Sequence, residues 1–297
     1  MKKKLLMAVV MLTLSILMMT SASFAWFTIS TNPEISALTT QVVVNENLEI
    51  ALAATGAAVP AAAAIGNTGN QYTWGNIIDL AAVVESESGI PDAKGFYTAL
   101  DKTLRPAALA PDKSKFQYPT YGSDGRVSIL GELPAGTMAN GFGNLTVGGK
   151  FYGYYVDFYL QSNNAGAVTL STGVDRSSAG ELGGGSTFTA GGTGLASAQN
   201  TLAKNIRIAF QPGATGPITA MTTTTPSETT ATTATFSGTV ASLTANTPQL
   251  VRMFVYLDGL SVTNAAASLA DGVVSGALNI QFDMASVGDS MDAESIT

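Results

Sequence analysis

The chain of 297 residues contains no cysteine and no histidine, and these two absences exclude much chemistry. Without cysteine there is no thiolate nucleophile, no disulfide framework and no thiolate metal site. Without histidine there is no Ser-His-Asp triad, no imidazole proton shuttle and no ordinary zinc or haem ligation. An enzyme would depend on carboxylates, lysine, tyrosine or serine alone, so we expect no enzymatic activity and no cofactor or metal.

Charged residues are also scarce, at 12% of the chain, about half the roughly 25% of an average soluble domain. Small and polar residues replace them, a composition typical of β-rich extracellular proteins. The net charge of −7 repels a nucleic-acid backbone, so nucleic acid is excluded as a partner.

The first 25 residues are interpreted as a signal peptide. Lys2 to Lys4 form a positive region, an apolar run follows from Leu5 to Met19, and Ser23-Phe24-Ala25 supplies the small-x-small pattern that signal peptidase recognises. Cleavage is predicted between Ala25 and Trp26; the alternative is an uncleaved anchor, because the extended apolar run nears the length that spans a bilayer. Cleavage removes three lysines and changes the net charge from −7 to −10. We therefore expect a secreted protein that meets the membrane only through its precursor.

Several segments alternate apolar and polar residues, which predicts β-strands because neighbouring side chains on a strand point to opposite faces. The clearest runs from Phe151 to Gln161, with Tyr155, Asp157 and Tyr159 expected on the outer face. The opposite face is expected to carry Tyr152, Tyr154, Val156, Phe158 and Leu160. The turn after Gln161 predicts a return strand at 168–170. Further strands are predicted at 42–44, 48–52, 206–210, 251–257 and 278–282, the first two paired with each other. Short strands without intervening helices favour an all-β fold, an antiparallel β-sandwich.

Three other stretches differ from this pattern within the expected β-sandwich domain of residues 26–297. Residues 56–149 are interpreted as an insertion or subdomain, partly irregular around its prolines, with a short helix at 76–84. The Gly-rich stretch 180–194 and the Thr-rich stretch 221–235 are predicted as exposed loops. For the Thr-rich stretch, a β-edge or a glycosylated segment remain alternatives.

Three pieces of the sequence together resemble TasA/camelysin-type secreted proteins. They are the processing region 23–28 with Thr31-Asn32-Pro33-Glu34, the strand 251–257 with its Asp258-Gly259 exit, and the closing strand 276–282. The resemblance implies a jelly-roll domain, processing by a dedicated signal peptidase, and polymerisation into biofilm fibres through insertion of the N-terminal strand into a neighbouring copy. The chain departs from that family in the long insertion at 56–149.

The freed N-terminus is the first candidate site. Trp26, Phe27, Thr28 and Ile29 form a short β-prone segment that needs covering once it is released, since an exposed apolar strand promotes aggregation. Either the segment from Trp26 to about Ile35 pairs within its own domain, or it adds to the edge of another copy as a donor strand. The corresponding hypothesis is a structural subunit of a cell-surface or extracellular fibre, a homopolymer whose other partner is the signal peptidase.

The alternative hypothesis is a monomeric surface carbohydrate-binding or adhesive module. Its candidate sugar-binding face is the row Tyr155, Asp157 and Tyr159, in which aromatic rings stack sugars and a carboxylate accepts their hydroxyl hydrogen bonds. A glycosidase would need a second carboxylate at a defined distance, and no pattern marks one.

Overall fold

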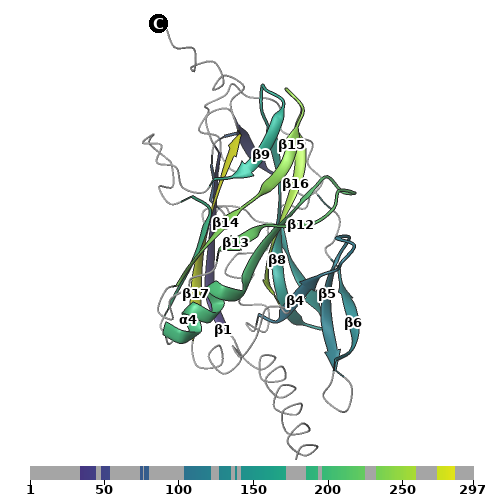
Figure 1. Ribbon diagram of the computed structural model, residues 1–297, viewed down its shortest axis with the longest axis vertical. Helices are drawn as coiled ribbons and strands as arrows, with labels where there is room; N and C mark the ends of the chain where they lie inside the picture. Colours follow the sequence, from purple (N-terminus) through teal and green to yellow (C-terminus); the bar gives the residue numbers. More distant parts are fainter. Residues whose placement is uncertain are drawn as a thin grey trace, which may run out of the picture.

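The protein folds as two β-sheets that pack face to face, as the computed structural model in Figure 1 shows. The structure describes residues 34–44, 48–53, 74–75, 77–79, 104–121, 127–134, 138, 142–171, 185–192, 196–224, 232–258 and 273–284. Within these residues no helix is long and apolar enough to cross a membrane.

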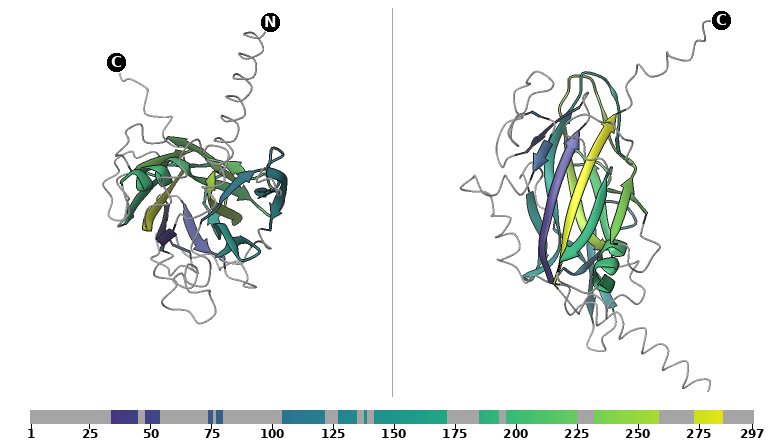
Figure 2. Two further views of the ribbon diagram at one scale, coloured as in Figure 1. Left: turned by 90° about the horizontal axis from the view of Figure 1, so that it is seen from below. Right: turned by 90° about the vertical axis from the view of Figure 1, so that its left-hand side faces the viewer.

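The first sheet has eight strands, and Figure 2 (right) views it face-on. Its main order is β13 (Thr222–Thr224), β14 (Thr233–Ser237), β10 (Thr187–Gly192), β17 (Val273–Met284), β1 (Glu34–Val44) and β3 (Ile77–Asp79). At the C-terminal end of β17, strand β9 (Gly166–Leu170) pairs with it, and β15 (Thr239–Leu243) pairs with β9.

The second sheet has nine strands. Its main order is β12 (Thr219–Ala220), β11 (Ile206–Pro212), β16 (Gln249–Asp258), β4 (Pro106–Leu109), β5 (Phe116–Tyr121) and β6 (Val127–Leu133). The long strand β8 (Lys150–Gln161) also pairs with β16, and its other side pairs with β2 (Glu49–Leu52) and β7 (Phe142–Val147).

The main core fills the space between the two sheets. The Phe282 ring of β17 lies 5.5 Å from the Phe158 ring of β8 and 5.7 Å from the Phe210 ring of β11, so one residue of the first sheet contacts two strands of the second. All three side chains are fully buried. The predicted all-β sandwich is therefore confirmed.

The antiparallel expectation needs correction at two pairings. β1 runs parallel to β17 over ten paired positions, from Glu34 with Val273 to Val44 with Phe282. β16 runs parallel to β4 at Leu257 and Asp258. Alternation indicates that a segment is a strand, but it does not indicate whether the strand runs parallel or antiparallel to its partner. Non-local packing sets that direction. The jelly-roll connectivity stays a prediction.

Strands were predicted correctly at 206–210, 251–257 and 278–282, where β11, β16 and β17 lie. Two predicted pairings are wrong. The strands at 42–44 and 48–52 exist but belong to opposite sheets, because β1 pairs with β17 and β2 pairs with β8. Strand β9 likewise does not return along β8; the turn at 162–165 crosses to the first sheet, where β9 pairs with β15 and β17.

The stretches predicted as irregular contribute regular strands. Residues 77–79 form β3, which pairs with β1, so the helix predicted at 76–84 is wrong there. Pro106 and Pro119 lie inside β4 and β5. The Gly-rich stretch contains β10, and the Thr-rich stretch contains β13 and the start of β14, so its described residues form a β-edge rather than a loop. Neighbouring strands supply the pairing that these weak local signals do not reveal.

The sequence pattern also missed helix α4 (Ala196–Asn205), which lies at the lower end of the sandwich in Figure 1. Its residues Leu202 and Ala203 are buried in the main core. At its C-terminus, the Arg207 guanidinium donates a 2.8 Å hydrogen bond to the Lys204 carbonyl, satisfying one of the carbonyls that a helix end leaves open.

Candidate functional site

The predicted cleavage and donor residues Ala25, Trp26, Phe27, Thr28 and Ile29 lie outside the described residues. The described chain begins at Glu34, the first residue of β1. Glu34 and Ile35, at the end of the expected donor segment, pair with Val273 and Val274 of their own chain. The structure therefore tests only the last two residues of that segment, and those two pair within the chain.

Strand β1 is paired unequally on its two sides. One side follows β17 over ten positions, whereas the other meets β3 only at Gln41, Val42 and Val43. Within the described residues, this second side of β1 therefore has no partner strand over 34–40, the arrangement that allows another strand to add. Val42 and Val44 anchor the far end of β1 in the core.

The candidate sugar-binding row is not open to solvent. Tyr155, Asp157 and Tyr159 are 7%, 0% and 9% exposed, so the expectation of an outer face that stacks sugars is wrong. The three side chains do point away from the main core, but further parts of the chain cover them. Tyr159 belongs to a cluster with Ala51, Ala53 and Trp74, whose ring lies 6.5 Å from that of Tyr159.

Asp157 forms a buried ion pair with Arg252, the residue directly opposite it on β16. The Arg252 Nε and Nη2 groups donate to the two carboxylate oxygens at 2.5 and 2.7 Å, a bidentate arrangement. The Arg252 guanidinium carbon also lies 3.9 Å from the centre of the Tyr155 ring, which favours a cation–π contact. The pair neutralises both charges inside the protein, where Asp157 and Arg252 are 0% and 1% exposed.

Sequence reasoning missed Arg252 because it assigned no partner to Asp157. The available signal was the alternation of β16, which puts Arg252 on the same face of the strand as Phe254 and Tyr256. That signal becomes a pairing only when the register between β8 and β16 is known. Because each of the two apolar strands carries one inner charged residue, of opposite sign, the sequence permits the prediction that the two residues form a cross-strand pair.

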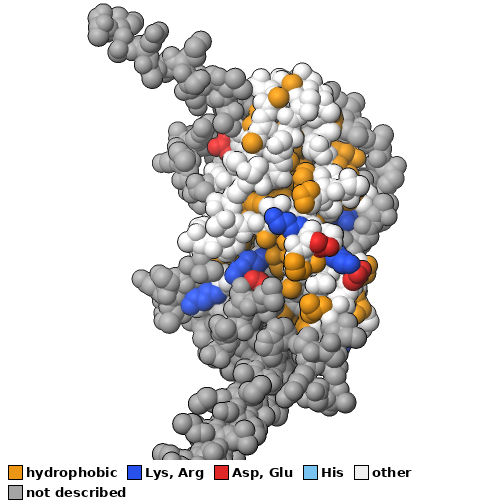
Figure 3. Space-filling model, turned by 45° about the vertical axis from the view of Figure 1, so that its right-hand side comes forward, with side chains coloured by type: hydrophobic (Ala, Val, Ile, Leu, Met, Phe, Trp, Pro, Cys, Tyr) orange, Lys and Arg blue, Asp and Glu red, His pale blue; other side chains and the backbone are white. Residues whose placement is uncertain are grey.

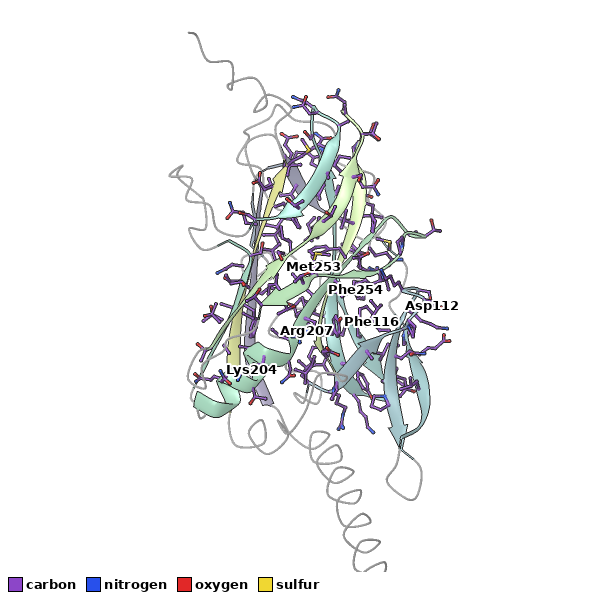
Figure 4. All side chains as sticks on the ribbon, viewed as in Figure 1. Asp112, Phe116, Lys204, Arg207, Met253 and Phe254 are labelled. Atoms are coloured by element: carbon purple, nitrogen blue, oxygen red, sulfur yellow. The ribbon has the colours of Figure 1, made fainter. Side chains whose placement is uncertain are left out.

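Strands β4 to β6, at one end of the second sheet, pack against the outer face of the same sheet beside this ion pair. The Phe116 ring of β5 lies 4.8 Å from the Phe254 ring and 4.7 Å from the Tyr256 ring of β16, and Figure 4 shows Phe116 and Phe254 side by side. Leu133 of β6 is buried in the same cluster. On this side of the molecule, Figure 3 shows hydrophobic surface between small groups of basic and acidic side chains. Strands β4 to β6 thus contribute to a second, smaller core on the outer face of the second sheet.

A β-bulge explains why Tyr152 lies on the face opposite to the one predicted. Leu145 of β7 pairs with Gly153, but the next residue, Thr146, pairs with Phe151, so Tyr152 is the extra residue. Gly153 has a φ of +147°, which side chains rarely tolerate. The bulge reverses the alternation, so Tyr152 joins the outer cluster while Tyr154 remains in the main core.

Two tyrosines on the outer face each cover a glycine on the neighbouring strand. Tyr155 is paired with Gly143, and a Cβ added at Gly143 would lie 2.4 Å from the Tyr155 hydroxyl oxygen. Tyr118 is paired with Gly131, where an added Cβ would lie 2.5 Å from the ring. Each ring fills the space that the missing side chain leaves, which pins the register of the two strands.

The remaining polar groups here indicate a structural role. Burial, and next the Asp258 carboxylate, raise the pKa of the Tyr256 hydroxyl well above its usual range. The Arg207 Nε lies 3.6 Å from the Asp258 carboxylate, which balances that charge. In the described part of the chain, no group of three or more acidic residues, histidines or cysteines has the geometry to hold a metal ion. This arrangement stabilises the outer face.

Comparison with protein-family models, with curated proteins and with solved structures found no significant match to this chain.

Proposed function

We propose that the chain is a secreted structural subunit of a cell-surface or extracellular fibre, in which the N-terminal segment of one copy completes a sheet of the next. The observation that carries the proposal is the unequal pairing of β1: over 34–40, no described strand pairs with its outer side. The predicted donor segment, Trp26 to about Ile35, ends within this strand. The proposal thus joins a β-prone apolar segment, expected from the sequence, with a strand side that no other described strand pairs with.

The energetics suit a lasting contact. Each fully buried large apolar side chain contributes about 1.5 to 3 kcal/mol, and backbone pairing adds hydrogen bonds. Trp26, Phe27 and Ile29 together supply most of what a stable contact requires. A fibre subunit needs no catalytic group, which agrees with the absence of cysteine and histidine.

The carbohydrate-binding alternative loses its candidate site. A sugar ring stacks on an aromatic face that it can reach, whereas Tyr155 and Tyr159 are under one-tenth exposed and Asp157 is bound to Arg252. No other observation favours this alternative over the fibre subunit.

The experiment is deletion of residues 26–32 from the mature chain, followed by electron microscopy across a concentration series. We expect the wild-type particles to lengthen with concentration and the truncated protein to stay monomeric. Its far-ultraviolet circular dichroism should remain largely intact, because β1 begins only at Glu34. The matched control removes residues 291–297, an equal length from the other terminus, and should assemble normally.

Three results would contradict the proposal. Wild-type protein that stays monomeric at every concentration excludes self-assembly. Fibres of normal appearance from the truncated protein place the contact elsewhere. Unfolding of the truncated protein assigns residues 26–32 to the core of their own domain.

A further inference from the structure

Three neighbouring strands of the first sheet each carry a Thr-x-Thr sequence. Thr222-Thr223-Thr224 forms β13, Thr233-Ala234-Thr235 begins β14, and Thr187-Phe188-Thr189 begins β10. The middle residues Ala234 and Phe188 are buried in the main core, so the flanking threonines point outward. The six outward residues, here called the threonine array, are Thr187, Thr189, Thr222, Thr224, Thr233 and Thr235.

The strand register brings five of these threonines into two rows across the sheet, whereas Thr222 pairs with Ser237. Thr224 pairs with Thr235, which pairs with Thr187, so one row crosses three strands. Beside it, Thr233 pairs with Thr189. Paired side chains lie about 4.5 to 5.5 Å apart across strands, and residues two apart on a strand repeat at about 6.4 to 6.8 Å. The result is a two-dimensional lattice of hydroxyl and methyl groups.

The array is exposed and its side chains are held in place. Thr187 is half-buried and the other five threonines are exposed. The Thr189 and Thr233 hydroxyl oxygens lie 3.2 Å apart and share a hydrogen bond across the two strands. A β-branched side chain on a strand also has few χ1 choices, so the methyl and hydroxyl groups keep fixed positions.

Strands β10, β13 and β14 contain no charged residue. The two rows continue onto β17 at Asn279 and Ala277, which are also uncharged. A charged ligand therefore has no counterion on the array. Aromatic rings, the usual platform for sugars, are turned inward here, as Phe188 and Phe236 are both buried. A partner for this surface must be neutral, must exchange hydrogen bonds with hydroxyls and must repeat in two directions.

We infer that the threonine array binds the surface of ice. Each hydroxyl both donates and accepts hydrogen bonds, so it can replace a water of the lattice, while the adjoining methyl group orders the water around it. Water oxygens at an ice face form rows that repeat in two directions at spacings of the same order as those of the array. Adsorbed protein then stops ice crystals from growing at the covered points.

The test is inhibition of ice recrystallisation by the purified mature chain, read as ice-grain size in an annealed frozen film, alongside the shape of single crystals near the melting point. We expect the wild-type protein at micromolar concentration to keep grains small and to facet crystals. Thr235→Lys, at the centre of the row, should lose both effects because its long charged side chain lifts the surface away from ice. Thr189→Lys provides a second array variant should Thr235→Lys fail to fold.

The matched control is Thr244→Lys, which adds the same side chain at an exposed threonine in the turn after β15, outside the array. It should keep wild-type activity, and circular dichroism should show each variant folded. A folded wild-type protein without effect on ice overturns the inference, as does full activity in a folded array variant. If the array variants change their oligomeric state but inhibit ice growth as the wild-type protein does, the array is a contact between copies and the inference is overturned. None of these outcomes depends on whether residues 26–32 are needed for fibres.

Discussion

The ion pair between Asp157 and Arg252 gives the sharpest prediction about stability. In Asp157→Ala the guanidinium keeps its position, with Arg252 only 1% exposed, but loses both carboxylate partners. Breaking a buried pair by removing one partner typically costs about 3 to 5 kcal/mol, because the charge that remains loses its counterion. We expect a loss of that size in the free energy of unfolding.

The measurement is equilibrium unfolding in urea, followed by tryptophan fluorescence, because Trp74 is buried beside Tyr159 in the same region. The midpoint should fall while the slope of the transition stays unchanged, which shows that stability rather than compactness has changed. The double variant Asp157→Leu with Arg252→Met removes both charges and should recover most of the loss, since well-packed apolar residues often replace a buried pair at little cost.

The ion pair between Lys115 and Glu132 serves as the exposed control, with side chains 38% and 65% exposed. Glu132→Ala should shift the urea midpoint far less than Asp157→Ala, because solvent already screens this pair. The reasoning is refuted if Asp157→Ala costs under about 1 kcal/mol, or if the double variant is as unstable as the single one.

Three further predictions concern glycines and a tyrosine. Gly153→Ala should destabilise the fold by about 1 to 3 kcal/mol in urea unfolding, because a φ of +147° is strained for alanine and the new Cβ would lie 2.3 Å from the Val255 carbonyl oxygen. Gly143→Ala should lower the melting temperature more than Gly131→Ala, because Arg252 holds the buried Tyr155 ring in place, whereas the half-buried ring over Gly131 can swing aside; equal losses would contradict this. The raised pKa of Tyr256 favours the neutral hydroxyl in the folded state, so its stabilising contribution is complete below pH 10.0 and declines above it; Tyr256→Phe should lessen that decline in melting temperature.

The sequence by itself determined where several strands lie and that the fold is all-β. Alternation at a period of two is a local property, so the patterns at 206–210, 251–257 and 278–282 indicated strands without any knowledge of their neighbours. It also located the strand that carries Tyr155, Asp157 and Tyr159. Local patterning was weakest where short strands depend on their neighbours, as in β3, β4 and β13.

The tertiary structure alone decided which strands pair and what covers each face. The alternation at 42–44 and 48–52 is the same whether the two strands pair or lie in opposite sheets, and only the packing separates them. The bulge beside Gly153 placed Tyr152 on the other face, because a single extra residue puts the alternation before it out of phase with the alternation after it. Register likewise turned a low-complexity threonine run and the distant Thr187 into one array, since positions far apart in the chain become neighbours only across paired strands.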